Sequence, residues 1–217
     1  MDRVKMKEKA KGMISGNYWN IWWPLLVIGV IETSLEYFFG FNPTIDFNDL
    51  KSLFDYHIGI GGYVGMGVMA IVTGVLNAGY LKYIVNFVRT GKFDANDIIE
   101  TIKNKWIDIL VAVILTSVIV TLGLIAFVIP GIILAFAYTL AVFLVIDKDV
   151  KGQDSLKESR ELMRGHKFEA FVLGLSFIGW AILVPFTLGI LAIWLVPYMT
   201  LTFAIYFDYL TKDYKGN

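Results

Sequence analysis

Six long apolar segments, separated by shorter polar stretches, account for most of this chain. They cover about 18–40, 62–88, 106–128, 130–146, 168–186 and 188–210. A helix needs about 20 predominantly apolar residues to cross a bilayer, and most of these segments reach that length. Their side chains do not alternate with the period of two that marks a transmembrane β-barrel strand. The pattern therefore predicts an all-α, polytopic membrane protein with six transmembrane helices, forming a single integral-membrane domain over residues 1–217.

Two of the polar breaks are very short, and both contain proline and glycine. They are the segments VIPGII at 128–133 and VPFTLG at 184–189. Proline ends or kinks a helix, and glycine permits the turn that follows. We therefore interpret each break as the tip of a helical hairpin rather than the middle of one very long helix.

The composition agrees with a membrane protein and adds an orientation. Apolar residues make up 57% of the chain and charged residues 18%, against about 45–50% and 25% in soluble domains. Of the 19 Lys and Arg residues, only Lys51 falls in the predicted loop 41–61, and the rest fall on the opposite side of the predicted spans. Because cytoplasmic loops carry the excess of Lys and Arg, we expect a multi-pass protein of the cell (plasma) membrane with both termini in the cytoplasm.

Catalytic and metal-binding patterns are missing from the sequence. The chain has no cysteine, which excludes disulfides and thiolate ligands. His57 and His166 fall on opposite sides of the predicted membrane, so they do not form one site. No zinc-protease, serine-hydrolase or phosphate-loop motif occurs. These observations predict a non-enzymatic protein with no cofactor and no metal site.

Three polar stretches that precede predicted hairpins resemble one another. They are MISGNYW (13–19), TIKNKW (101–106) and LMRGHKF (162–168). Each joins a short amphipathic stretch to an aromatic residue that opens a span. The pattern predicts three helical hairpins, each preceded by a short cytoplasmic amphipathic helix. Internal symmetry of this kind is common in transporters, and it also follows from plain duplication of a hairpin.

The third of these stretches has the features of a capped surface helix. Ser155 and Glu158 have the spacing of a capping box, which satisfies free amides at a helix start. Gly165 stands where a helix would end in a left-handed residue. Arg164 and Lys167 then fall near the negative end of the helix dipole and beside the lipid headgroups.

The segment SRELMRGHKFEAFVLGLSFIGWAILVPFTLGI, together with GNYW (16–19), IPG (129–131) and PY (197–198), resembles a known bacterial family. This is the integral-membrane family catalogued as domain of unknown function nine-seven-five. The residues that carry the resemblance are Ser159, Arg160, Met163, Gly165, Phe171, Leu175–Trp180, Thr187 and Gly189. The family often has a second glycine where this chain has Leu191, which affects that hairpin tip.

The family resemblance implies the membrane fold and assigns no catalytic residue or substrate to this chain. A more distant likeness is to the membrane domain attached to some glycerophosphodiester phosphodiesterases, which is not their catalytic part. Function has to be inferred from the residues themselves.

Glu32 and Glu36, two carboxylates in the first predicted span, are the sharpest functional candidates. They lie one helical turn apart, and Glu32 is about 16 Å along the helix from Ile21. A carboxylate at such depth is costly and often functional. Glu32 could be neutral and hydrogen-bonded to a hydroxyl such as that of Thr73, or both carboxylates could reach outer water. Asn77, in the second span, favours a hydrogen bond between helices.

The leading hypothesis is a membrane scaffold or accessory protein with a basic cytoplasmic rim. That rim would meet anionic lipid headgroups or a protein partner, and its candidate residues are Arg160, Arg164, His166 and Lys167. Pairing of the arginines with Glu158 and Glu161 is the structural alternative. A second copy of the chain is compatible with the pattern, and nucleic acid is not expected. The alternative function is a small transporter or channel subunit that uses Glu32 and Glu36.

Overall fold

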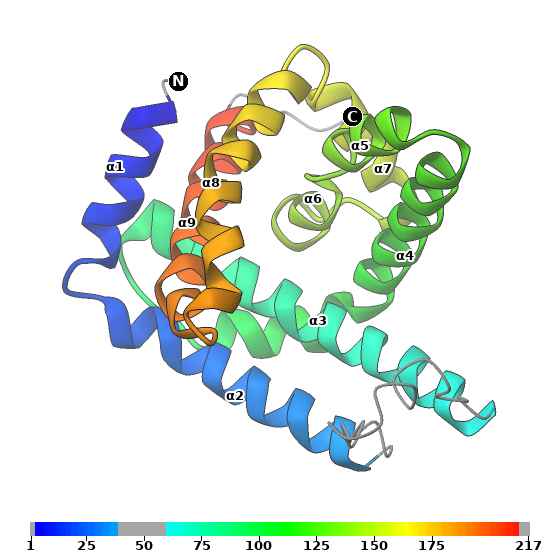
Figure 1. Ribbon diagram of the computed structural model, residues 1–217, viewed down its shortest axis with the longest axis horizontal. Helices are drawn as coiled ribbons and strands as arrows, with labels where there is room; N and C mark the ends of the chain where they lie inside the picture. Colours follow the sequence, from blue (N-terminus) through cyan, green and yellow to red (C-terminus); the bar gives the residue numbers. More distant parts are fainter. Residues whose placement is uncertain (1–2, 39–59, 213–217) are drawn as a thin grey trace.

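The computed structural model describes residues 3–38 and 60–212, and their regular secondary structure is α-helical (Figure 1). Six stretches of these helices are long and apolar enough to cross a membrane. The prediction of an all-α protein with six membrane-length segments is therefore confirmed. The predicted loop 41–61 falls almost entirely outside the described residues. The helices of the described residues are α1 (Arg3–Ile14), α2 (Tyr18–Phe38), α3 (Ile60–Thr90), α4 (Asn96–Ala126), α5 (Val128–Ala137), α6 (Ala141–Lys148), α7 (Gly152–Leu162), α8 (Lys167–Phe186) and α9 (Ile190–Leu210).

The third span is longer than the sequence pattern predicts, because α4 runs unbroken from Asn96 to Ala126. The separate amphipathic helix expected at 101–106 is not seen; these residues are part of α4. No Gly or Pro occurs between 96 and 122 to end the helix. A separate helix does precede the other two pairs, as α1 before α2 and α7 before α8. The threefold repeat of hairpins stays a prediction.

The turns from α1 to α2 and from α7 to α8 have the same backbone conformation. Gly16 and Gly165 have φ angles of 84° and 86°, which glycine adopts without steric cost. In both turns the next amide N–H donates to the carbonyl three residues earlier. Gly165 has the predicted left-handed conformation, although α7 ends earlier, at Leu162.

Two short connections, predicted as hairpin tips, join α4 to α5 and α8 to α9. Phe127 alone separates α4 from α5 and has extended backbone, with φ −158° and ψ 134°. Pro130 lies in the first turn of α5, where its missing N–H has no helix partner to lose. Between α8 and α9, Gly189 has a φ of 83°. The Thr187 hydroxyl accepts a hydrogen bond from the N–H of Leu191 at 3.2 Å, which caps the start of α9.

The fourth predicted span, 130–146, is not one continuous helix. Residues 138–140 divide it into α5 and α6. Beside this break lies Ser159 of α7, which is fully buried. Its hydroxyl donates to the carbonyl of Ala137 at 2.9 Å and accepts from the N–H of Leu140 at 3.2 Å. Because a dry environment offers these groups no water, Ser159 supplies the hydrogen bonds that a continuous helix would make.

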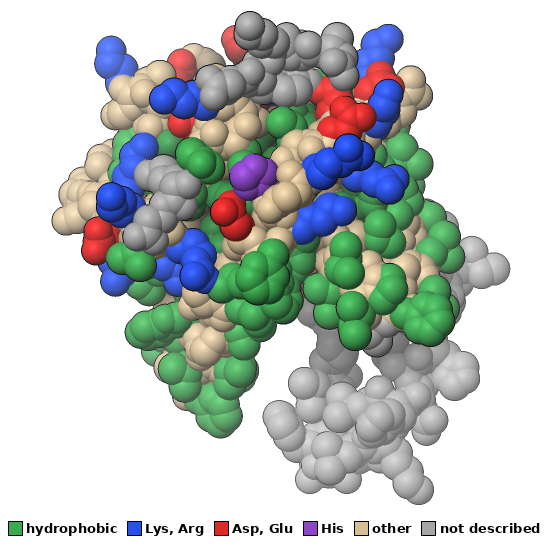
Figure 2. Space-filling model, turned by 90° about the horizontal axis from the view of Figure 1, so that it is seen from above, with side chains coloured by type: hydrophobic (Ala, Val, Ile, Leu, Met, Phe, Trp, Pro, Cys, Tyr) green, Lys and Arg blue, Asp and Glu red, His purple; other side chains and the backbone are tan. Residues whose placement is uncertain are grey.

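The buried core lies in the parts of the spans next to the charged side of the molecule. Buried residues concentrate in the first halves of α2, α4 and α8, in the second halves of α3 and α9, and throughout α6. The opposite ends expose large apolar side chains, including Phe127, Phe186 and Leu188. In Figure 2, Lys, Arg, Asp and Glu side chains gather over the upper part of the molecule, and hydrophobic side chains cover the described parts that project below. Such apolar ends are suited to contact with lipid.

Three prolines lie inside the described membrane-length helices, and at two of them a neighbouring helix bonds the carbonyl that the proline leaves without its helix partner. Pro24 in α2 has no N–H to donate to the carbonyl of Asn20. The hydroxyl of Tyr83, on α3, donates to that carbonyl at 2.7 Å. The neighbouring Tyr80 donates to the next carbonyl, that of Ile21, at 3.2 Å. These two hydrogen bonds connect α2 to α3 beside Pro24.

The second such proline, Pro197 in α9, frees the carbonyl of Ile193 in the same way. Two side chains of α2 donate to it: the indole N–H of Trp22 at 2.5 Å and the hydroxyl of Tyr18 at 3.2 Å. Because the core of a bilayer supplies no water for such groups, both proline-containing helices depend on donors from a neighbouring helix.

Replacing Tyr83 by Phe should destabilise the protein, because the carbonyl of Asn20 then loses its cross-helix donor. A buried polar group left unpaired costs about 1–3 kcal/mol. Replacing Pro24 by Ala supplies a main-chain N–H for the same carbonyl, so Tyr83→Phe should cost less in a Pro24→Ala background. Thermal unfolding of the two single variants and the double variant in mild detergent measures this difference. Equal costs in both backgrounds would show that Tyr83 does not act through this carbonyl.

Candidate functional site

Three cations predicted from the sequence lie where α7 meets α8. Arg160 is in the last turn of α7, Arg164 is in the connecting turn, and Lys167 is the first residue of α8. The two arginines are exposed and Lys167 is half-buried. Within the described part of the chain, none of the three forms an ion pair with a carboxylate. Arg160, Arg164 and Lys167 are called the basic rim below.

His166, the fourth residue predicted for this site, is held through both its ring and its main-chain carbonyl. Its Nδ1 lies 3.0 Å from Oε2 of Glu169. Its main-chain carbonyl accepts a hydrogen bond from the hydroxyl of Tyr206, on α9, at 3.1 Å. His166 therefore fixes the start of α8, and the three cations of the basic rim are the residues of this site that are available to bind an anion.

Glu158 and Glu161 are the carboxylates that α7 offers to Arg160 and Arg164, and neither pairs with them among the described residues. The Oε2 atom of Glu158 is shielded from solvent and accepts no hydrogen bond from the described residues. Burial raises the pKa of Glu158 above its ordinary value, and the nearby Asp154 and Glu161 add to this effect. The arginines are thus left free for an external anion.

The capping box predicted at Ser155 and Glu158 is wrong. The helix begins earlier, at Gly152, so Ser155 lies inside it and donates to the carbonyl of Gly152 at 2.7 Å. The N–H of Gly152 donates instead to Oδ1 of Asp108, on α4, at 2.9 Å. A side chain at position 152 would overlap the main-chain carbonyl of Asp108, so only glycine permits this approach. A carboxylate from another helix therefore caps α7.

The inner face of α7 and the turn after it also hold the basic rim in place. Leu156, Ser159 and Met163 are buried there. Ser159 bonds both sides of the break between α5 and α6. The arginines therefore project from a helix that is fixed to α4 at its start and to the interrupted span along its length.

A second charged cluster, absent from the sequence-based predictions, joins three spans. The side chain of Asp147, near the end of α6, is only 1% exposed. Its Oδ1 accepts hydrogen bonds from Nζ of Lys82 at 3.1 Å and from Nη1 of Arg89 at 2.7 Å. The Nε of Arg89 also donates to Oδ1 of Asp208 at 2.6 Å. One guanidinium group therefore connects α3 to both α6 and α9.

No local sequence pattern pairs the members of this cluster. Arg89 is 58 positions from Asp147 and 119 from Asp208. Each residue stands near the polar end of a predicted span, where a charge is ordinarily solvated. The usable signal is that Asp147 directly follows the apolar run AVFLVI and therefore lies next to the buried core.

The predicted intramembrane polar residues are only partly brought together. Nδ2 of Asn77 lies 3.4 Å from Oε1 of Glu32 and 2.9 Å from the main-chain carbonyl of Thr73. This contact links α2 to α3. Thr73 takes part through its carbonyl rather than through the predicted hydroxyl bond to Glu32. Glu36 is exposed and lies outside this contact.

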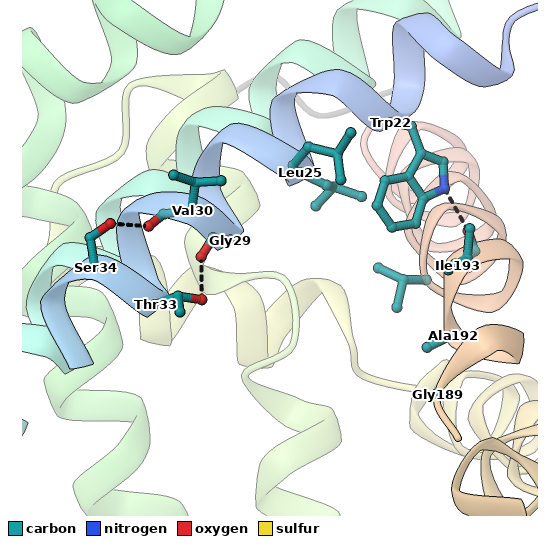
Figure 3. Close-up of a pocket in the computed structure, with 11 residues that line it drawn as sticks. Trp22, Leu25, Gly29, Val30, Thr33, Ser34, Gly189, Ala192 and Ile193 are labelled. Atoms are coloured by element: carbon teal, nitrogen blue, oxygen red, sulfur yellow. Dashed lines mark hydrogen bonds between the residues drawn. The ribbon is translucent and has the colours of Figure 1, made fainter. Parts of the chain in front are cut away.

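A groove with a volume of about 630 Å³ separates α2 from α9. Trp22 lines it at the point where these helices are bonded together (Figure 3). Its hydroxyl groups face their own helix: Thr33 donates to the carbonyl of Gly29 at 2.8 Å, and Ser34 to that of Val30 at 2.7 Å (Figure 3). The groove is therefore mostly apolar, and its hydroxyls are occupied. Among the described residues, no group of three or more acidic or histidine side chains is placed to hold a metal ion.

Residues 118–214 match the model of a family described as "Protein of unknown function (DUF975)". Over this stretch the chain is similar to the DUF975 family. The predicted family resemblance is thus confirmed, whereas the likeness to the membrane domain of glycerophosphodiester phosphodiesterases stays a prediction. The DUF975 stretch contains the basic rim, the break between α5 and α6, and both Asp147 and Asp208. No curated protein and no solved structure matches the chain.

Asp147→Asn should destabilise the protein strongly, because Lys82, Arg89 and Lys148 then lose the buried carboxylate that they surround. Removing one partner of a buried ion pair costs about 3–5 kcal/mol. The side chain of Asp208 is 37% exposed, so Asp208→Asn should cost about 1 kcal/mol or less. Thermal unfolding in detergent compares the two variants. Similar losses for both would contradict a dominant role for Asp147.

Proposed function

We propose that this protein is a non-enzymatic membrane scaffold or accessory protein whose basic rim binds anionic phospholipid headgroups. The observation that carries the proposal is the unpaired state of the rim in the described part of the chain. Arg160 and Arg164 are exposed and form no ion pair, although Glu158 and Glu161 stand on the same helix. Each basic residue close to an anionic leaflet contributes about 1 kcal/mol to binding.

Arg89 and Lys105, two other cations near the span ends, differ from the rim because carboxylates of the protein neutralise them. Arg89 bonds Asp147 and Asp208, and Lys105 pairs with Asp149. These residues hold the fold together and have little positive charge left for a ligand. The charge of the basic rim, by contrast, is available at the surface.

The position of the basic rim also suits a membrane surface. α7 is bonded to α4 at its start and to the break in the fourth span by Ser159, so little conformational freedom is lost when a headgroup binds its arginines. Phe168, directly after Lys167, is 74% exposed and can enter the lipid beside the charged groups. The excess of Lys and Arg on this side supports a cytoplasmic orientation in the cell membrane.

Replacing Arg160, Arg164 and Lys167 together by Gln should reduce the phosphatidylglycerol and cardiolipin that co-purify with the protein. The amide side chains keep polarity and remove the charges that attract phosphate. Lipid extraction from protein purified in mild detergent, followed by mass spectrometry, measures the change. Unchanged anionic lipid in a correctly folded triple variant would reject the proposal.

A matched control removes three other exposed cations, Lys5, Lys9 and Lys92. Its net charge equals that of the rim variant, and it should keep the bound anionic lipid if the position of the charges, rather than the total charge, decides lipid binding.

Because the chain has no cysteine, a single introduced cysteine can report on which side of the membrane a residue lies. A single cysteine at Arg164 should react with an impermeant thiol reagent only after the cells are permeabilised.

The contact between Glu32 and Asn77 supports a second candidate function, that of a small transporter or channel subunit. A carboxylate inside a membrane-length helix often marks an ion pathway. If Glu32 carries a proton or cation, Glu32→Gln should abolish the flux of that ion into liposomes while the protein stays folded. Glu36 is exposed, so Glu36→Gln should reduce the flux less than Glu32→Gln does. Equal flux with and without Glu32→Gln would reject this role.

A further inference from the structure

A second groove, between α5 and α8, has the form of a lipid site. Its volume is about 450 Å³. One face of α5 lines it with residues spaced as i, i+3, i+4 and i+7, and the first turn of α8 supplies aromatic rings. Phe136 and Phe171 close its floor with an edge-to-face contact at a centroid distance of 5.5 Å. The residues lining the groove are Ile129, Ile132, Ile133, Phe136, Lys167, Phe168 and Phe171.

Lys167 is the one charged side chain among the described residues that line this groove. It is half-buried and forms no ion pair with a described carboxylate. The nearest carboxylate along the chain, Glu169, is already in contact with His166 at 3.0 Å. The groove therefore combines an apolar surface with a single unpaired positive charge at the first residue of α8.

We propose that the groove between α5 and α8 holds one acyl chain of an anionic glycerophospholipid, with the phosphate bound by Lys167. The proposal rests on the lipid-binding function proposed above and names the ligand class. A hydrocarbon chain matches the apolar lining, and a phosphate monoester or diester matches the lysine charge. A zwitterionic lipid matches less well, because its own ammonium group competes with Lys167 for the phosphate.

The exposure of the groove residues favours a lipid chain over water as the occupant. Ile129, Ile133 and Phe168 all expose much of their apolar surface, and they belong to helices of a membrane-length pair of spans. Lys167 lies at the boundary of this apolar surface, where a long amphipathic side chain keeps its charge near the headgroups. A second copy of the chain is the competing occupant, and the experiment below separates the two.

The test fills the groove with a larger side chain. Ile132→Trp should lower the amount of dioleoyl-phosphatidylglycerol retained by the purified protein about tenfold, as overpacking removes space for the chain. Ile182→Trp is the matched control, because Ile182 is an exposed residue of α8 that does not line the groove. Native mass spectrometry counts the lipids bound to each chain and detects dimers. Ile133→Phe is a second filling variant if Ile132→Trp does not fold.

Two further arms test the headgroup and the chain separately. Lys167→Gln should remove the preference for dioleoyl-phosphatidylglycerol over dioleoyl-phosphatidylethanolamine and leave some lipid in the groove. Free glycerol phosphate should not displace the bound lipid, because it lacks a chain. Displacement by glycerol phosphate, or unchanged lipid in both filling variants, would overturn the proposal. Loss of a dimer without loss of lipid would assign the groove to a second copy and overturn it as well.

These outcomes are distinguishable from failure of the proposed function. If the triple rim variant loses anionic lipid and the filling variants do not, the basic rim binds lipid and the groove does not. If the filling variants lose lipid while Arg160→Gln with Arg164→Gln does not, the groove binds lipid without the arginines of the rim.

Discussion

The buried carboxylate of Asp147 holds three spans of this protein together. Removing such a group from water costs several kcal/mol, and the cost is tolerated only where cations and hydrogen-bond donors surround the group. Lys82 and Arg89 provide both. Arg89 has donors on separate nitrogen atoms of one planar group, so it bonds Asp147 on α6 and Asp208 on α9 at once. A lysine, with one ammonium group, does not match that geometry. The spans are therefore fixed at their charged ends, while their opposite ends expose apolar side chains.

A second constraint acts on the backbone. In a dry environment every carbonyl and N–H needs a partner within the protein, and three interruptions among the described helices show how this need is met. Pro24, Pro197 and the break at 138–140 each leave groups that the helix itself does not bond. Side chains from neighbouring helices bond these groups: Tyr83, Trp22 and Ser159. The interruptions and the packing of the helices therefore depend on each other. The side chains that pack between helices also supply the hydrogen bonds that the interrupted backbone lacks.

The sequence predicts the spans well and the contacts between them poorly, for a physical reason. Length and apolar content decide whether a segment crosses a bilayer, and both are local properties. The break between α5 and α6 is not local: no Gly or Pro occurs at 138–140, and the residue that bonds the break, Ser159, is 19 to 22 positions away. The capping box at Ser155 fails for the same reason, since Asp108 from α4 bonds the start of α7 instead. The basic rim could be predicted because its charges are close in the sequence. They also lie at the surface, where few side chains from other helices are placed to pair with them.

The basic rim and the break in the fourth span share one helix, which bears on how a bound lipid would act. Arg160 stands next to Ser159, and α5, which lines the proposed lipid groove, ends at the break. A ligand shifts a conformation only if it binds two arrangements with different affinity. Ser159 is fully buried and bonds both sides of the break, and Asp108 fixes the start of the same helix. This junction is thus held in one arrangement by several bonds at once. A lipid on the proposed site would therefore act as a fixed part of the protein surface, in keeping with the proposed scaffold role, rather than as a signal that moves the helices.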